Sequence, residues 1–362
     1  MTTTANSTAA KTRIRYFDMA KGVGILFVVV YHILGSLMQT DYKAFMPLVT
    51  RYIVTIALPI FFIISGMQDH LGNIRNKDFK IYASKKLKVL LVPFFTFSVI
   101  SILINQIQSL VLGQGIDKAY LRGAFISIVT FKGFSVYWFL PALLIGQMVF
   151  FFSLGLSDGA RRILYIGLVF LILLSFNHFE AVGVVGAILI TIIRGLYASC
   201  YICFGYELFS IFNILDKAKI KRTIYFLVGV LGLVGQGFLS ARVGDGDINS
   251  MCFDHPFLFL LSALIGSVSI ILLLRLLEDK AIISASLSSL GTNSLIIMGT
   301  HMDYLVLSLA FYLGYLAARL SPKAKELVLY ICIVAVVFAV EALLIWLYNN
   351  CLYWMIGKTK KH

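Results

Sequence analysis

Long apolar runs separated by short polar segments repeat along the whole chain. A helix needs about 20 mainly apolar residues to cross a bilayer, and ten runs approach or exceed that length. These runs cover residues 22–40, 46–67, 87–112, 134–154, 162–178, 183–212, 223–241, 256–277, 287–318 and 326–356. The pattern predicts an all-α polytopic membrane protein with about ten transmembrane helices. The ninth and tenth runs are long and are expected to tilt or break, with Gly291 and Gly314 as weak points.

Composition and charge support this fold class and suggest an orientation. The chain is 60% hydrophobic and only 13% charged, unlike a soluble globular protein. If the N-terminus is cytoplasmic, 21 of the 31 Lys and Arg residues fall in or beside cytoplasmic segments, and an even number of spans returns the C-terminus to the cytoplasm. Orientation and anionic lipid then account for the net charge of +14, so no nucleic-acid partner is expected.

The predicted domain organisation is correspondingly simple. We expect a polar N-terminal segment over residues 1–20, a single transmembrane domain over residues 21–356 and a basic tail over residues 357–362. The first apolar run is too long for the core of a signal peptide, so we expect it to be retained. The predicted location is the plasma (cytoplasmic) membrane of a bacterium.

The first apolar run carries the most specific pattern, RIRYFDMAKGVGILFVVVYHILG. Lys21 and His32 are separated by three helical turns, so they share one stripe, about 16 Å apart along the axis. Lys21 is thereby expected at the membrane edge and His32 near mid-depth, with Asp18 close to the same face. From the residues alone, His32 is as readily a hydrogen-bonded interhelical histidine as a catalytic one.

Other ionisable residues also lie within predicted spans. Arg194 lies in the sixth run and Glu341 in the tenth, and His301 is expected at a depth similar to that of His32. A charged group at bilayer depth costs about 2.5–3.5 kcal/mol on insertion scales, so it needs a partner or a cavity. A functional role and a structural ion pair both fit Arg194 and Glu341.

Two further segments offer candidate binding groups. The segment RNKDFKIYASKKLK, with Lys85, Lys86 and Lys88, forms a basic amphipathic start to the third run. These lysines fit a topology anchor and also phosphate binding. In the second run, Ser65 and Gly66 end the sequence FFIISG, which on its own is a packing motif.

Signatures of metal chemistry are weak. Cys200 and Cys203 form a C-x-x-C without a second pair, and small apolar residues in a helix explain them better than a metal does. The acidic segment ARVGDGDINSMCFDHP lacks a full calcium-loop pattern and is expected to be a solvated outer loop. We therefore predict no metal.

Taken together, the motifs resemble the acyltransferase 3 family of integral membrane acyltransferases. The resemblance rests on RIRYFDMAKGVGILFVVVYH, LPIFFIISG, KKLKVLLVPFF, YWFLPALL and LGTNSLIIMGTH, which occur in this order over most of the chain. Many members have arginine where this chain has Lys21, a departure that keeps the charge but loses bidentate phosphate pairing. Some relatives append a soluble esterase-like domain. This chain stops soon after its last span, so an acyl relay to such a domain would need a separate extracytoplasmic transferase as partner.

The resemblance implies transfer of an acyl group, by default acetyl, from cytosolic acyl-CoA to a hydroxyl of an extracytoplasmic or lipid-linked glycan. It implies His32 as the essential histidine and Lys21 as the basic member of its motif, and it matches Arg15, Asp18, Ser65 and His301 to family motifs. Our candidate catalytic residues are His32, Lys21, Asp18, His301 and Glu341. Our candidate residues for binding acyl-CoA are Arg15, Lys21, Ser65, Lys85, Lys86, Lys88 and Arg194.

Two other functions compete with the enzyme. A polytopic exporter or flippase of glycan or lipid would use the buried charges Arg194 and Glu341 along its path. A purely structural membrane scaffold would leave His32 and Lys21 freely replaceable. Substrate movement in vesicles without acyl-CoA would distinguish the exporter from the enzyme.

Overall fold

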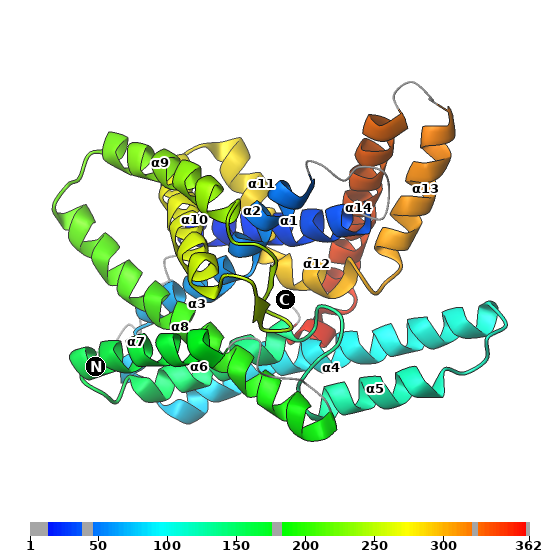
Figure 1. Ribbon diagram of the computed structural model, residues 1–362, viewed down its shortest axis with the longest axis horizontal. Coiled ribbons are helices and arrows are strands. Elements are labelled where there is room, and N and C mark those ends of the chain that lie inside the picture. Colours follow the sequence, from blue (N-terminus) through cyan, green and yellow to red (C-terminus); the bar gives the residue numbers. More distant parts are fainter. Residues whose placement is uncertain (1–13, 38–45, 176–182, 321–324, 360–362) are drawn as a thin grey trace, which may run out of the picture.

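The computed structural model describes residues 14–37, 46–175, 183–320 and 325–359, and this part of the chain is almost entirely helical (Figure 1). The α-helices are α1 (Arg15–Leu37), α2 (Met46–Ala57), α3 (Pro59–Leu71), α4 (Phe79–Val111), α5 (Lys118–Val129), α6 (Phe139–Ser153), α7 (Asp158–Ser175), α8 (Gly183–Lys217), α9 (Arg222–Ser240), α10 (Pro256–Leu277), α11 (Ala281–Thr292), α12 (Ser294–Thr300), α13 (Val306–Leu320) and α14 (Lys325–Asn350). Short 3₁₀ turns cover Ile74–Asn76 and Tyr353–Ile356, and a hairpin pairs β1 (Gly246–Asp247) with β2 (Cys252–Phe253).

The helices agree with the predicted class of membrane protein. Within the described residues, seven helices are long and apolar enough to cross a membrane, or eight if the bent pair α11–α12 counts as one span. Every predicted apolar run contains helix, but α6 and α13 are short. The count of ten spans and the cytoplasmic location of both termini therefore stay predictions. Residues 1–13 of the predicted N-terminal segment lie outside the described residues, and α1 begins six residues before the predicted domain boundary at residue 21.

The ninth predicted span is not one helix. α11 and α12 meet at an angle of 55° at Asn293, two residues after Gly291, and α13 begins only at Val306. The prediction of a weak point is therefore confirmed for Gly291, which lies next to the break. It is wrong for Gly314, which lies inside the continuous helix α13 and packs against the α14 side chains Leu329 and Ile333.

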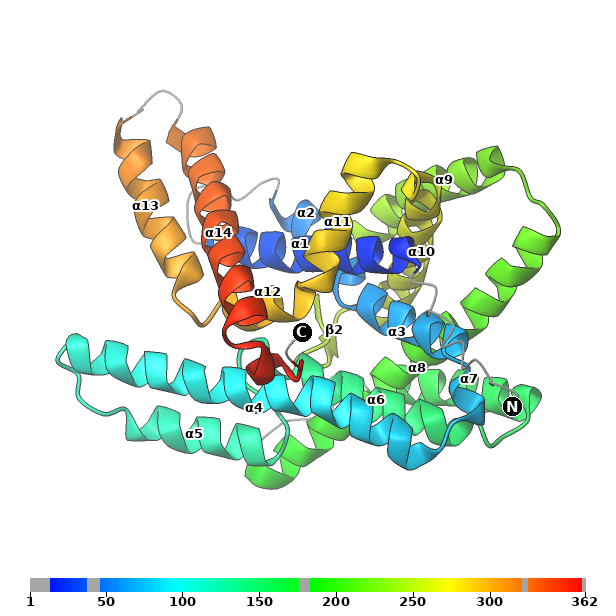
Figure 2. The same ribbon diagram turned by 180° about the vertical axis from the view of Figure 1, so that it is seen from behind.

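Glycine pairs allow two helix crossings to be unusually close. At the crossing of α1 and α11, a methyl group on Gly22 would overlap the Leu287 carbonyl, and one on Gly291 would overlap the Asp18 carbonyl (Figure 2). At the crossing of α3 and α8, Gly66 and Gly205 have the same relation to carbonyls of the opposite helix. Backbone contact of this kind is the usual use of small residues in membrane helix packing.

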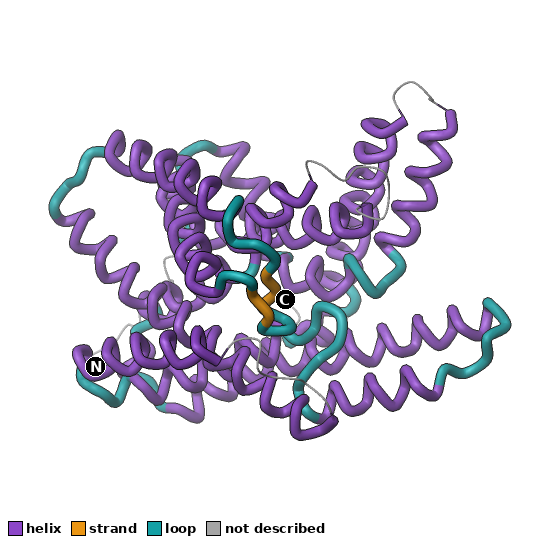
Figure 3. Tube along the Cα trace, in the orientation of Figure 1, coloured by secondary structure: helices purple, strands orange, loops and turns teal. Residues whose placement is uncertain are grey.

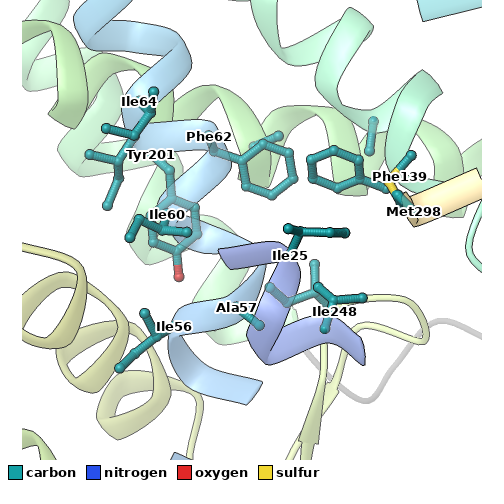
Figure 4. Packing of buried hydrophobic residues seen from close by; sticks show 14 of the residues in the cluster. Ile25, Ile56, Ala57, Ile60, Phe62, Ile64, Phe139, Tyr201, Ile248 and Met298 are labelled. Carbon is teal, nitrogen blue, oxygen red and sulfur yellow. The ribbon is translucent and has the colours of Figure 1, made fainter. Parts of the chain in front are cut away.

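The core forms where these crossings converge. Figure 4 shows Ile25 of α1 and Phe62 of α3 packed with Phe139 of α6, Met298 of α12 and Ile248 of the β-hairpin. These five residues come from five elements far apart in sequence, and all are buried. The hairpin is therefore part of the core.

The β-hairpin lies between α9 and α10, close to the middle of the molecule in Figure 3. Its Ile248, Met251 and Phe253 side chains are each at most 3% exposed, whereas Asp245 and Asp254 are exposed. The prediction of a solvated loop was therefore wrong for the apolar half of this segment. Alternation of apolar and polar residues puts Ile248 and its neighbours inward and leaves the acids outside.

Candidate active site

The centre of the candidate site is a pair of histidines from α1 and the end of α12. The His32 and His301 rings have centroids 5.2 Å apart and planes at 45°. His301 is fully buried, and His32 is partly buried. The sequence predicted these two histidines at similar depth, and the fold brings their rings together. It does so because α11 crosses α1 and the bend at Asn293 directs α12 toward His32.

One hydrogen bond determines the tautomer of neutral His301. Its Nδ1 lies 2.8 Å from the Ile297 carbonyl oxygen, which can only accept, so Nδ1 carries the hydrogen. Nε2 is then the acceptor nitrogen. It is buried and has no hydrogen-bond partner among the described residues. An imidazole held by one nitrogen, with the other unused, has the arrangement of a base or of a group that orients a base.

Glu341 of α14 contacts Thr300, the residue immediately before His301. The Thr300 Oγ1 lies 3.0 and 2.8 Å from the two Glu341 carboxylate oxygens and 2.8 Å from the Ile296 carbonyl oxygen. Glu341 is 2% exposed. The sequence predicted that a carboxyl group in the tenth span would need a partner. For Glu341 that partner is the Thr300 hydroxyl, next to His301. This contact puts Glu341 close to the histidine pair, whereas its role as a catalytic residue stays a prediction.

The polar residues at the start of α1 lie on the Lys21–His32 stripe. The Lys21 Nζ is 3.0 Å from an Asp18 carboxylate oxygen, and the Lys21 side chain keeps partial exposure. Arg15 is exposed, and its backbone N–H donates to the Glu278 carboxylate at 2.8 Å. Asp18 lies next to the close crossing with Gly291, so Lys21 and Asp18 are held in place by helix packing.

The three lysines at the start of α4 differ in their surroundings. Lys86 donates to Asp69 at 3.0 Å, and Asp69 also accepts from the Tyr82 hydroxyl at 2.9 Å. Lys85 and Lys88 are exposed. Lys86 is therefore already part of a partly buried ion pair that ties α4 to α3, whereas Lys85 and Lys88 present their charges outward.

The C-terminal turn packs onto the same part of α4. The Thr96 hydroxyl donates to the Met355 carbonyl at 2.7 Å, and Gly357 lies against the Lys88 carbonyl. Lys358 donates to the Asn349 side-chain oxygen at 2.8 Å. Gly357, the first residue of the predicted basic tail, therefore lies beside Lys88 of α4, and the sequence predicts both of them on the cytoplasmic side.

Ser65 lies in the core at the crossing of α3 and α8. Its hydroxyl accepts a hydrogen bond from the Gln147 side-chain amide of α6, and Ser65 is 7% exposed. The structure places it in helix packing, in line with the alternative noted for FFIISG. Its predicted contact with acyl-CoA stays a prediction.

Arg194 is held by backbone and side-chain oxygens of two loops. Its guanidinium donates to the Asn249 carbonyl at 2.6 Å, to the Asn249 side-chain oxygen at 2.7 Å and to the Lys132 carbonyl at 2.7 Å. It also lies 5.1 Å from the Trp138 ring centroid. Arg194 therefore anchors the β-hairpin to the loop before α6. These contacts of Arg194 include neither Glu341 nor the lysines of α4.

Several polar residues near the site were not identified from the sequence. Asp303 lies two residues after His301, between α12 and α13, and Gln147 and Asp69 are both buried. An ionisable residue within an apolar run was the available signal for Asp303, because such residues face partners or cavities. The structure describes no group of three or more His, Cys, Asp or Glu side chains arranged to hold a metal ion.

The fold is that of a helical, multi-pass membrane protein, and the described helices bring two histidines together in its interior. A family model described as an acyltransferase domain, that of the acyltransferase 3 family, matches residues 14–346. The chain belongs to this family, and its class of activity is membrane acyl transfer. No curated protein sequence and no solved structure gives a significant match to the chain.

Proposed function

We propose that this protein is an O-acyltransferase that moves an acetyl group from cytosolic acetyl-CoA to a hydroxyl of an extracytoplasmic or lipid-linked glycan. The observation that supports this proposal best is the histidine pair. His32 lies on the stripe of the basic residue Lys21, and its ring is 5.2 Å from that of His301, whose Nε2 is free to accept a hydrogen bond.

The donor is proposed to bind at the basic face formed by the start of α1 and the start of α4. Coenzyme A carries phosphates, which bind Lys and Arg side chains strongly. Arg15, Lys85 and Lys88 have exposed side chains there, and Lys21 is partly exposed. A thioester arm directed from Lys21 along α1 would reach His32 after about 16 Å, three turns of helix.

In the proposed reaction His32 is the general base. It removes the proton from the acceptor hydroxyl while the hydroxyl oxygen attacks the thioester carbonyl carbon. The carbon–sulfur bond then breaks, and the coenzyme A thiolate leaves and takes up the proton from the His32 imidazolium. His301 Nε2, which has no partner among the described residues, accepts a hydrogen bond from the His32 ring when substrate is bound and so orients His32. Glu341 holds the end of α12 through Thr300. General-base assistance contributes about 10²–10⁴-fold to rate.

A covalent route uses the same residues. His32 attacks the thioester itself, releases coenzyme A and passes the acyl group from its imidazole to the acceptor hydroxyl. Initial-rate kinetics separate the two routes, since a covalent carrier gives parallel lines in double-reciprocal plots and direct transfer gives intersecting lines. If the acyl group is relayed further, a separate extracytoplasmic transferase is the expected partner.

The test uses the purified full-length protein in lipid nanodiscs with [¹⁴C]acetyl-CoA. Release of coenzyme A is measured by chromatography, and the acceptor is supplied as membrane vesicles from cells that lack the protein. His32→Ala is expected to lower the rate about 10²–10⁴-fold. Lys21→Ala is expected mainly to weaken acetyl-CoA binding. His255→Ala is the matched control, because His255 is an exposed histidine after the β-hairpin.

The outcomes separate the assignments. Equal turnover by wild type and His32→Ala would refute the role of His32. A wild-type protein that neither binds acetyl-CoA nor labels the vesicles would refute the proposed function. Vesicle-to-medium movement of glycan without acetyl-CoA would instead support an exporter.

A further inference from the structure

The segment between α12 and α13 carries a carboxylate that the proposed reaction has not used. Asp303 follows His301 by two residues, in the stretch between Thr300 and Val306 that is not α-helical. Its Oδ2 atom is buried and has no hydrogen-bond partner among the described residues. A carboxylate in this position normally has a partner, because an unpaired charge within a membrane protein is costly.

Among the described residues, the immediate neighbours of Asp303 are neutral. Ser135 and Tyr137, from the loop before α6, lie next to its carboxylate, and Tyr120 of α5 is within electrostatic range. The Tyr137 hydroxyl donates to the Gly299 carbonyl at 3.1 Å, and the Ser135 hydroxyl is itself buried without a partner. The Ser135 and Tyr137 hydroxyls thus lie close enough to the Asp303 carboxylate to interact with it, but neither makes a well-formed hydrogen bond to Oδ2, so this oxygen can still accept one from a ligand.

Aromatic rings lie beside this polar group. The Phe97 ring is stacked with Tyr137 at a centroid distance of 6.3 Å and contacts Tyr304 and Tyr348 at 6.3 and 5.5 Å. The Tyr304 and Tyr348 hydroxyls are 2.8 Å apart and hydrogen-bonded to each other. We name Asp303, Ser135, Tyr137 and Tyr304 the Asp303 cluster.

The chemistry of the cluster selects one class of ligand. A carboxylate accepts hydrogen bonds from hydroxyl groups, a serine hydroxyl both donates and accepts, and tyrosine rings offer apolar faces. A cation is a poorer match, because Ca²⁺ takes six to eight oxygen ligands and Mg²⁺ six. A polyhydroxylated, uncharged ring matches the cluster best.

We propose that the Asp303 cluster binds the acceptor sugar, with Asp303 accepting hydrogen bonds from hydroxyls next to the one that is acylated. The inference rests on the proposed function and adds the acceptor side of the site. Asp303 lies only two residues from His301, whose ring is 5.2 Å from that of His32, so a sugar bound there is next to the base. Asp303 is a binding residue in this scheme and does not transfer the proton.

The experiment compares wild type, Asp303→Asn and Asp303→Glu as full-length proteins in nanodiscs. Two quantities are measured: the dissociation constant for [¹⁴C]acetyl-CoA alone, and the transfer of label to graded amounts of vesicles from cells that lack the protein. Asp303→Asn is expected to raise the KM for vesicle acceptor about tenfold or more and to leave the acetyl-CoA dissociation constant within about twofold. Asp303→Glu, which keeps the charge, is expected to recover part of the affinity.

A matched control is Asp279→Asn, since Asp279 is an exposed carboxylate whose ion pair with Arg222 lies on the surface. It is expected to behave as wild type in both measurements. An unchanged acceptor KM in Asp303→Asn would overturn the inference and leave the proposed function standing. An equal loss of acetyl-CoA binding and transfer would also overturn it, because it would mean that Asp303 is needed for structure. Failure of wild type to bind acetyl-CoA or to label the vesicles would overturn both proposals.

Discussion

Replacing Gly291 with alanine tests whether the close crossing of α1 and α11 determines the geometry of the site. The added methyl would overlap the Asp18 carbonyl oxygen, which is backbone and cannot rotate away. Restoring a normal contact of about 3.5 Å requires the two helices to separate by roughly 2 Å at this point. Overpacking of this kind costs about 1–3 kcal/mol of unfolding free energy.

The same displacement would alter the histidine pair. His32 is on α1, and α11 leads through the bend into α12 and His301, so a shift at the crossing moves one ring relative to the other. A misplacement of about 1 Å in a catalytic geometry can cost about 100-fold in rate. We therefore expect Gly291→Ala to lower turnover about 100-fold, a larger effect than its loss of stability suggests.

The assay combines thermal unfolding, followed by intrinsic fluorescence in nanodiscs, with acetyl-CoA turnover. Gly167→Ala is the matched control, because a methyl on Gly167 of α7 would meet no atom within 4 Å. The control is expected to unfold at or slightly above the wild-type temperature. If Gly291→Ala unfolds at the wild-type temperature and turns over at the wild-type rate, the close crossing has no role in positioning the site.

Three further substitutions test individual contacts. His301→Asn keeps a donor for the Ile297 carbonyl and removes Nε2, so we expect normal folding with turnover lowered about 100-fold or more, and wild-type turnover would show that His301 is only structural. Arg194→Leu leaves the oxygens of Asn249 without their donors, so we expect faster proteolysis within the β-hairpin, and an unchanged digestion pattern would contradict the anchoring role. Ser65→Ala leaves the buried Gln147 side-chain amide without an acceptor, so we expect the unfolding free energy to fall by about 1–3 kcal/mol. Acetyl-CoA binding is expected to be retained, and weakened binding would instead support the predicted contact of Ser65 with acyl-CoA.

Much of the fold could be predicted because the apolar runs are long and the bilayer sets their length. The sequence also indicated that His32 and His301 lie at similar depth, since each can be counted from the end of its run. It could not indicate that the two rings meet. That contact depends on α11 crossing α1 at Gly22 and Gly291, and on the 55° bend at Asn293, both of which are tertiary features.

The roles of single charged residues were harder to predict for a related reason. The sequence showed that Arg194 and Glu341 each need a partner, but helical periodicity does not predict which residue from another element that partner is. The partners are a backbone carbonyl and side chain in the β-hairpin for Arg194, and the Thr300 hydroxyl for Glu341. The hairpin itself was misjudged because its three aspartates and its glycines are typical of a solvated loop, although Ile248 and its apolar neighbours determine where it lies.

The crossing of α1 and α11 also constrains how the protein is made. Gly22 meets its partner helix only after roughly 270 more residues have been synthesised, which takes about 15–50 s at ordinary translation rates. During that interval α1 is in the membrane without the helix that covers its glycine face. The ion pair between Lys21 and Asp18 lies within α1 itself, so these two charges can compensate each other before α11 is synthesised. Assembly of the histidine pair is consequently one of the last steps of biogenesis, and chains that end before α12 contain His32 without a site.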